Sequence, residues 1–351
     1  MDYTVLLESG ESLGRPFDMS VSSRPFPFSP PGAPAVEIVE LTTLDAEHLE
    51  SLWAEEQGFW KELLYWDSEP ATALVRAAVR QRRLPGKVIL AEGKAVGCAY
   101  YLIDGSRAVL GSFTLAERAR TPAMVATLAK GLLGAVQSKP GVRRIETQFV
   151  PCAISSLRDA FLATGFREFE RVFLRGDLTM SRGAPTDHRD LQFVPWASSH
   201  AHRAAELMHQ AHRGSVDADM NELYRTPEGC RGLLDSIIVQ HGCGKLVPTA
   251  SYVLREPRSP SLAGFLLTTE ISTGHAHLAQ VAVSPSAQGH GLGKLLLGRA
   301  IEALAKAGYR SVSLMVSETN ERALALYASM GFRAILEFPV FSWDRLPLGS
   351  R

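Results

Sequence analysis

Apolar residues alternate with polar ones along some segments of the chain and recur every three or four residues along others. In the second half this pattern predicts strands at Leu191–Trp196, Ala250–Arg255, Leu262–Ile271, His277–Val283, Ser311–Val316 and Ala334–Trp343, and helices at Ser199–Ala211, Gly293–Ala307 and Glu321–Met330. In the first half it predicts strands at Val36–Leu41, Lys87–Ala91, Ala95–Ile103, Ala108–Thr114, Arg143–Phe149 and Glu168–Leu174, and helices at Asp45–Trp66, Pro122–Gln137 and Ser155–Thr164. The expected fold class is α/β (α+β), with mixed, mostly antiparallel sheets flanked by helices.

The two halves end alike, which indicates a duplicated domain. Each closes a helix with Gly-Phe followed by Arg, and Phe166 and Phe332 are 166 positions apart. Residues 1–35 are rich in Ser, Pro and Gly and are expected to be a disordered lead-in, whereas the polar residues 181–190 are expected to be a linker. We therefore predict one domain over residues 36–180 and a second over residues 191–351; two unrelated mixed domains are the alternative.

Composition and charge describe an ordinary globular chain. Its 351 residues suit two domains, and 37 Lys plus Arg balance 37 Asp plus Glu. This balance disfavours nucleic acid as the main partner, because phosphate binding leaves a basic footprint. The four cysteines are scattered, no signal peptide is recognisable, and no apolar run approaches the roughly 18 residues of a membrane helix, so we expect a cytoplasmic protein.

The segment His277–Lys294 carries the strongest signal for chemistry. It contains a strand, a turn with proline and a loop with three alternating glycines, and it leads into an amphipathic helix. Such a loop allows close backbone approach, and the helix start offers unpaired N–H groups and partial positive charge, so the segment suits a phosphate or pyrophosphate. A Walker loop is excluded, because Gln288 stands where its first glycine belongs and Leu295 follows the lysine; the dinucleotide fingerprint fails as well.

The run Gln288-Gly-His-Gly-Leu-Gly293 fits Gln/Arg-x-x-Gly-x-Gly/Ala, and here the sequence resembles the GNAT superfamily of acetyltransferases. The later segment Glu318–Phe332 is similar to a second motif of that family, in which an Asn, a Tyr and Gly-Phe occupy fixed places. The close likeness covers roughly Leu262–Trp343, and a looser one extends back to Leu191. It implies acetyl-CoA or another acyl-CoA as co-substrate, a small-molecule or peptide amine as acceptor, and no metal.

The resemblance also implies roles for individual residues. The strand backbone would face the pantetheine arm, the glycine loop would cradle the pyrophosphate, and Asn320 would contact the cofactor, although Asn320 also suits a helix cap. The cofactor-binding residues expected on this basis are Val281, Ala282, Val283, Gln288, Gly289, His290, Gly291, Leu292, Gly293, Lys294 and Asn320. In the family's Tyr position, Tyr327 would donate a proton to the departing sulfur, or it packs as an aromatic residue in its helix.

The base that deprotonates the amine is open between two residues. Some relatives carry a glutamate near the place of His277, and a histidine suits amine deprotonation at neutral pH; Glu270 on the preceding strand is the rival. Residues 277, 279, 281 and 283 are expected on one side of their strand. Cys243 is interpreted as a loop cysteine rather than a nucleophile, and the histidines within residues 200–212 as a solvated helix face rather than metal ligands.

The first half resembles a decayed copy of the second. Its segment Leu115–Ala123 lacks the glycines, and Phe161 stands where the second copy has Tyr327. Both losses predict a non-catalytic domain that supports the second half and shapes the acceptor cleft; tandem GNAT proteins, mycothiol synthases among them, share this layout. The sequence therefore favours an N-acyltransferase that moves an acetyl or other short acyl group to a primary amine by direct attack, without an acyl-enzyme. The alternative is a non-catalytic acyl-CoA sensor or scaffold.

Overall fold

The computed structural model describes residues 36–147, 155–178, 191–255 and 261–345, so the expected lead-in and linker lie outside the described residues. The strands of the first half are β1 (Val36–Glu40), β2 (Gly86–Ala91), β3 (Lys94–Asp104), β4 (Arg107–Leu115), β5 (Arg144–Thr147) and β6 (Arg167–Asp177). Its helices are α2 (Glu50–Leu64), α3 (Glu69–Arg80), α4 (Pro122–Gln137) and α5 (Ser155–Ala163), with the short 3-10 turn η3 (Glu117–Ala119) before α4.

The second half repeats this order with further helices. Its strands are β7 (Gln192–Pro195), β8 (Lys245–Leu246), β9 (Tyr252–Arg255), β10 (Leu262–Ser272), β11 (His275–Val283), β12 (Ser311–Ser317) and β13 (Arg333–Asp344). Its helices are α6 (Ala201–His212), α7 (Val216–Met220), α8 (Pro227–Ile238), α9 (Leu292–Lys306) and α10 (Glu321–Ser329), with the 3-10 turn η6 (Glu222–Arg225) after α7.

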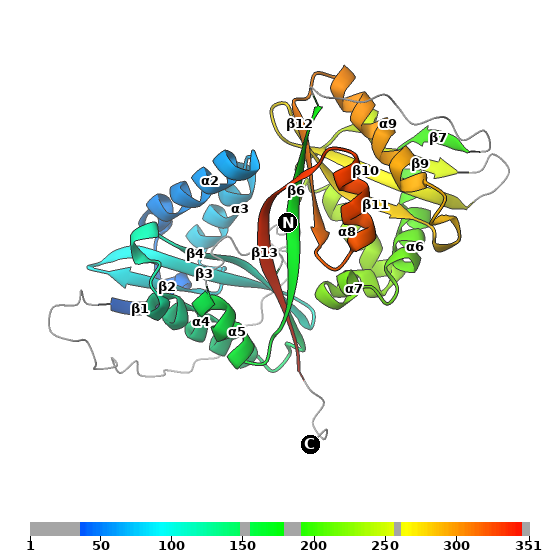
Figure 1. Ribbon diagram of the computed structural model, residues 1–351. Coiled ribbons are helices and arrows are strands. Elements are labelled where there is room, and N and C mark those ends of the chain that lie inside the picture. Colours follow the sequence, from blue (N-terminus) through cyan, green and yellow to red (C-terminus); the bar gives the residue numbers. More distant parts are fainter. Residues whose placement is uncertain (1–35, 148–154, 179–190, 256–260, 346–351) are drawn as a thin grey trace.

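Within the described residues, thirteen strands form one sheet that runs through both halves (Figure 1). Its order is β1-β2-β3-β4-β5-β13-β6-β12-β11-β10-β9-β7, and β8 pairs with β10 outside this path. Most neighbours are antiparallel; β4 pairs with β5, and β11 with β12, in parallel. The predicted fold class of mixed, mostly antiparallel strands flanked by helices is confirmed.

The two halves exchange their last strands, which the sequence did not predict. β6 of the first half pairs with β12 along Ser311–Ser317, and the chain's final strand, β13, pairs with β5 of the first half. β6 and β13 also pair with each other and run side by side between the halves (Figure 1). The two strands occupy equivalent places in the duplicated sequence, so each can complete the other half's sheet edge. The division at residues 181–190 stays a prediction, but the sheet is shared.

Helices cover both faces of the sheet in the second half. Leu266 of β10 packs in the core that α9 and α10 close, whereas its neighbours Phe265 and Leu267 pack against α6 and α8 on the opposite face. This alternation follows from the two-residue period of a strand. Of the described helices, none has the length and apolar character needed to cross a membrane.

Each predicted strand and helix is present with shifted ends, but three helices were missed. α3 was missed although its buried residues Val75, Ala78 and Val79 have helical spacing. α7 spans only five residues, and α8 contains two glycines, which lower helix propensity. The missed α7 and α8 carry much of the wall of the site described next.

Candidate functional site

β11 and β12 diverge and leave an open strand edge between them. They pair only where His275–His277 lie beside Ser311–Ser313. Beyond these residues β11 stays paired with β10 as far as Val283, and β12 stays paired with β6 as far as Ser317. In the described part of the chain, the backbone groups of β11 that point toward β12 after Leu278 therefore have no strand partner. An extended ligand can occupy this gap in place of a strand.

A β-bulge in β11 changes which side its residues face. Leu267 lies opposite Gln280 while Thr268 lies opposite Leu278, so Ala279 is an additional residue in the strand. Ala279 packs on the α6 face of the sheet, whereas Val281 and Val283 pack on the α9 face. The expectation that residues 277, 279, 281 and 283 share one side is wrong, because the bulge reverses the alternation.

The glycine loop leads into a helix start with amides that no side chain caps. Gly289 and Gly291 have φ angles of 89° and 79°, in the left-handed region, and Gly291 is the N-cap residue of α9. A Cβ on Gly293 would lie 3.2 Å from Cδ2 of Leu326, so this glycine allows α9 to pack closely on α10. The first N–H groups of a helix have no acceptor within the helix. The loop therefore has the geometry expected of an anion cradle, and its occupation by CoA stays a prediction.

Two polar side chains hold and flank this loop. Nε2 of Gln288 donates to the carbonyl oxygen of Val283 at 3.2 Å, which ties the loop to the end of β11. Nη2 of Arg322 would lie 3.9 Å from a Cβ on Gly289, so a cation stands beside the loop, which the sequence analysis missed. His290 and Lys294 are exposed at the surface of the loop and of α9. Arg322 and Lys294 make this end of the site electropositive.

The equivalent place in the first half has lost these features. The turn η3 replaces the glycine loop, and α4 starts at Pro122, which has no N–H group. Oγ1 of Thr121 accepts a hydrogen bond from the amide of Met124, so this N–H group at the start of α4 is not available to a ligand. Phe161, at the position equivalent to Tyr327, is buried and stacks on Phe341. These observations support the prediction that the first half is non-catalytic.

A cavity of ≈ 130 Å³ opens where β11 leaves β12. Residues of β11, β12, α7, η6 and α8 line it, together with Cys243. The first half contributes four further lining residues, namely Trp66, Glu146, Thr147 and Arg171. The cavity therefore lies between the halves, at the inner end of the strand whose outer end reaches the glycine loop.

His277 lies in the cavity wall and is held neutral. Its side chain is 5 % exposed, its Nδ1 lies 2.9 Å from Oγ of Ser313, and the ring of Trp66 lies 5.0 Å away. Burial is the main cause that lowers the pKa of His277 to about 3, and the cation of Arg171 acts in the same direction. A histidine with this pKa accepts a proton poorly at neutral pH.

Glu270, the rival base, does not line the cavity. Its Oε1 accepts a hydrogen bond from the amide of Gly274 at 3.4 Å, in the turn between β10 and β11. The carboxylate thus serves the hairpin turn, at the end of β11 remote from the glycine loop.

Asp217 places a carboxylate in the cavity wall and starts a chain of polar contacts. Its Oδ1 accepts from Oγ of Ser317 at 2.8 Å, and its Oδ2 lies 3.7 Å from Nδ1 of His212. Nε2 of His212 in turn lies 3.3 Å from the amide nitrogen of Gln280, whose amide oxygen accepts from the hydroxyl of Tyr224 at 3.2 Å. The interpretation of His212 as part of a solvated helix face is wrong, because α7 and η6 fold over that end of α6.

Tyr327 packs against the core beneath α9 and does not line the cavity. Burial, followed by the charge of Asp217, raises the pKa of Tyr327 to about 12, while Arg171 acts in the opposite direction. Its ring packs against Phe332, with centroids 5.8 Å apart. The phenol therefore stays protonated at neutral pH and can donate a proton.

Asn320 caps α10. Its Oδ1 accepts from the amide of Ala323 at 3.1 Å, so the structural explanation given for this residue is confirmed. Contact with a cofactor remains a prediction for Asn320, since capping occupies only the side-chain oxygen.

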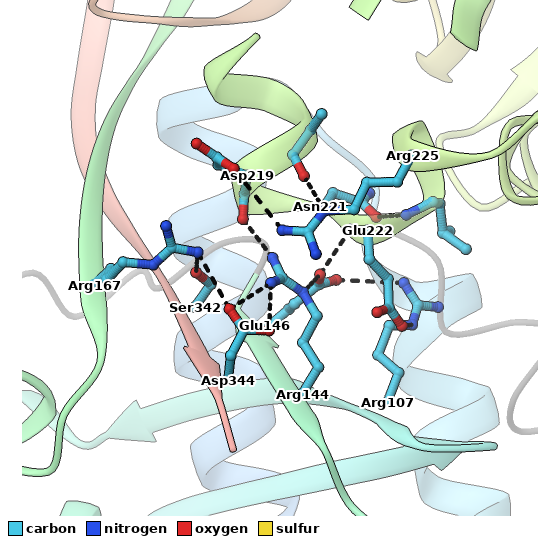
Figure 2. A network of polar contacts seen from close by, with 12 residues as sticks. Arg107, Arg144, Glu146, Arg167, Asp219, Asn221, Glu222, Arg225, Ser342 and Asp344 are labelled. Atoms are coloured by element: carbon cyan, nitrogen blue, oxygen red, sulfur yellow. Dashed lines mark hydrogen bonds and ion pairs between the residues drawn. The ribbon is translucent and has the colours of Figure 1, made fainter. Parts of the chain in front are cut away.

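A buried network of charges joins the first half to the wall of the cavity (Figure 2). Arg144 donates through Nε to Glu146 and through Nη1 to both carboxylate oxygens of Asp344, at 2.8 and 2.9 Å. Arg107 approaches the second oxygen of Glu146 at 3.4 Å, and the amide of Glu222 donates to the first at 2.8 Å. The network fixes η6, and with it the neighbouring α7 that bears Asp217, on β5 of the first half.

The splayed strand pair and the glycine loop lie within a segment of the chain that matches a known family. Residues 218–332 match the model of the acetyltransferase (GNAT) family. A solved GCN5-related N-acetyltransferase from Sphaerobacter thermophilus has the same fold, with a TM-score of 0.62 at 16% identity, covering 89% of this chain and 96% of that chain. A tandem GNAT protein from the clavulanic acid biosynthesis pathway gives a TM-score of 0.55 at 17% identity, over 89% and 99% of the two chains.

Curated relatives match shorter segments. A mycothiol acetyltransferase from Renibacterium salmoninarum is 35% identical over 88 residues, which cover 24% of this chain and 26% of the relative. The ribosomal protein bS18-alanine N-acetyltransferase of Escherichia coli K12 is 39% identical over 71 residues, which cover 20% of this chain and 47% of the relative. The matches thus span about a quarter to a half of these relatives. The chain has the tandem GNAT fold, and its second half carries the GNAT family domain.

Proposed function

We propose that this protein is an N-acyltransferase that moves an acetyl or other short acyl group from acyl-CoA to a primary amine by direct attack. The observation that carries the proposal is one strand, β11, that joins three features. Its outer end meets the uncapped amides of the glycine loop, its middle is an open edge toward β12, and its inner end lines the cavity. The four residue steps from Ala279 to Val283 span about 13 Å, a suitable length for an extended arm between a diphosphate and a thioester.

The cavity is the proposed acceptor site, and its groups suit the proton transfers of the reaction. An amine must lose a proton to attack a thioester, and the departing sulfur must gain one. We assign proton acceptance to Asp217 rather than to His277 or Glu270, because Asp217 lines the cavity as a carboxylate, His277 is a weak base and Glu270 lies elsewhere. Tyr327 donates to the sulfur. No side chain needs to carry the acyl group.

Purified protein mixed with acetyl-CoA and a panel of primary amines, with release of free thiol followed, tests the proposal. Asp217→Asn should lower kcat/KM by about 100-fold or more, within the range of general base catalysis. Asp219→Asn is the matched control, because Asp219 lies two residues along the same helix and is exposed, and its carboxylate approaches Arg225 at 3.9 Å while its contact with Arg144 uses the backbone carbonyl, which the substitution keeps. Activity of Asp217→Asn within a few-fold of the wild type would disprove the assignment of the base.

The alternative function is an acyl-CoA sensor or scaffold. It predicts that CoA raises the melting temperature but that no acceptor releases thiol above the rate of hydrolysis. A cytoplasmic location belongs to the proposal as well, and it rests on the scattered cysteines of the sequence.

A further inference from the structure

Arg171 is a cation in the cavity wall whose hydrogen-bonding capacity is largely unused. It lies on β6, opposite Ser317 of β12. Its Nη2 donates to the carbonyl oxygen of Met315 at 3.4 Å, while its buried Nε has no hydrogen-bond partner among the described residues. A guanidinium carries five N–H donors, and a buried donor without an acceptor is unfavourable. Arg171 as a residue lines the cavity, so a ligand there can offer an acceptor to its guanidinium group.

Other arginines at this boundary have partners. Arg107 and Arg144 share the carboxylate of Glu146. Arg175, four residues along β6 on the same face, lies over the ring of Tyr65 at 4.0 Å and donates to the carbonyl oxygen of Leu63 at 2.9 Å. In the described residues Arg171 forms no ion pair, unlike Arg107 and Arg144, and no ring contact of the kind that Arg175 makes is found for it.

Of the charged side chains that line the cavity, Glu146 is paired with Arg107 and Arg144, and the other two are Arg171 and Asp217. Arg171 and Asp217 both line it and are not paired with each other. They act with opposite signs on the pKa values of His212 and Tyr327, so both charges lie near the same groups. A ligand that bears both an anionic and a cationic group satisfies this arrangement.

The volume of the cavity suits a small ligand. Its volume is ≈ 130 Å³. An apolar protein cavity of about 150 Å³ holds a benzene molecule, so the space suits about six non-hydrogen atoms. A small α-amino acid has this size, and its carboxylate matches the planar fork of a guanidinium.

We propose that the acceptor is a small amino acid, with its carboxylate bound by Arg171 and its amine directed to Asp217. This inference rests on the proposed function. Because Arg171 belongs to β6, the exchanged strand makes the first half a determinant of acceptor specificity. The phosphates of CoA are not the partner of Arg171, since the glycine loop begins beyond Val283, about 13 Å along β11 from Ala279.

The test compares free amino acids with their amides as acceptors at saturating acetyl-CoA. For the best acceptor, wild-type kcat/KM should be about 100-fold higher for the acid than for the amide, the size expected for a buried charge pair. Arg171→Gln should bring this ratio close to one by raising KM for the acid, with the Kd for CoA unchanged. Arg171→Lys, which keeps the positive charge, should keep part of the preference for the acid over the amide. Arg175→Gln, on the same strand and face, should keep all of it.

Each outcome of these assays supports or overturns the inference about Arg171. Equal rates for acids and amides with the wild type would overturn the inference and leave the proposed function intact. The same holds if the wild type accepts only amines that lack a carboxylate. Equal losses for acid and amide in Arg171→Gln would show a structural role for Arg171. If that variant does not fold, the wild-type ratio and Arg171→Lys decide. If CoA binds but no amine releases thiol, the proposed function fails. In that case thermal unfolding tests the carboxylate site separately: stabilisation by an amino acid but not by its amide supports binding of the carboxylate by Arg171, and equal stabilisation refutes it.

Discussion

Replacement of Gly291 by alanine should weaken CoA binding through backbone geometry alone. Gly291 and Gly308 stand at opposite ends of α9, with φ angles of 79° and 83°. A Cβ on either residue would meet no atom within 4 Å, so neither substitution causes a clash. The left-handed conformation costs a residue with a side chain about 1–2 kcal/mol. Gly291→Ala and Gly308→Ala should therefore lower the melting temperature by similar amounts, roughly 2–4 °C per kcal/mol.

The two variants should differ in affinity for the cofactor. Alanine at position 291 is relieved of strain when the loop leaves its left-handed turn, and this movement turns the amides of the loop away from the ligand. CoA binding must then restore the strained conformation, so the same 1–2 kcal/mol raises Kd by about 5- to 30-fold. Gly308→Ala should stay within twofold of the wild type.

Calorimetric titration with CoA, together with thermal unfolding of both variants, measures these effects. If Gly291→Ala binds CoA as tightly as the wild type while its melting temperature falls with that of Gly308→Ala, the loop does not hold the diphosphate. An equal loss of affinity in both variants would instead show that general destabilisation weakens binding.

Two further substitutions test the catalytic acid and the join between the halves. Tyr327→Phe should lower kcat by about 10²–10⁴-fold in the thiol-release assay with the Kd for CoA kept, and survival of turnover within a few-fold would make Tyr327 a packing residue. Because the pKa of Tyr327 is raised to about 12, about 1 % of the phenol ionises at pH 10 against half for an ordinary tyrosine, so proton donation should persist at pH 10 and fail only above it. Glu146→Gln leaves Arg107 and Arg144 without their shared carboxylate and should cost about 3–5 kcal/mol in urea unfolding. Glu62→Gln, at an exposed position of α2, should be nearly neutral, and equal effects of the two substitutions would contradict the role of the network.

Features of this protein that depend on neighbouring residues could be predicted from its sequence. The strands, most helices and the left-handed glycine at the start of α9 follow from apolar spacing and from the freedom of glycine. The cap formed by Asn320 is equally local, since its partner lies three residues away. The order of the two GNAT motifs also identified the fold class, because each motif describes one turn and its helix.

Features that depend on residues far apart in the chain were decided by the tertiary structure. Nothing local shows that β6 joins β12, because strand pairing is set by which edge is free when the sheet assembles, and the two copies offer equivalent edges. That pairing brings Arg171 to within reach of Asp217, and the packing of Trp66 beside His277 buries the imidazole and lowers its pKa. Burial and charge act through space, so the sequence alone located the glycine loop, whereas only the folded chain assembled the cavity.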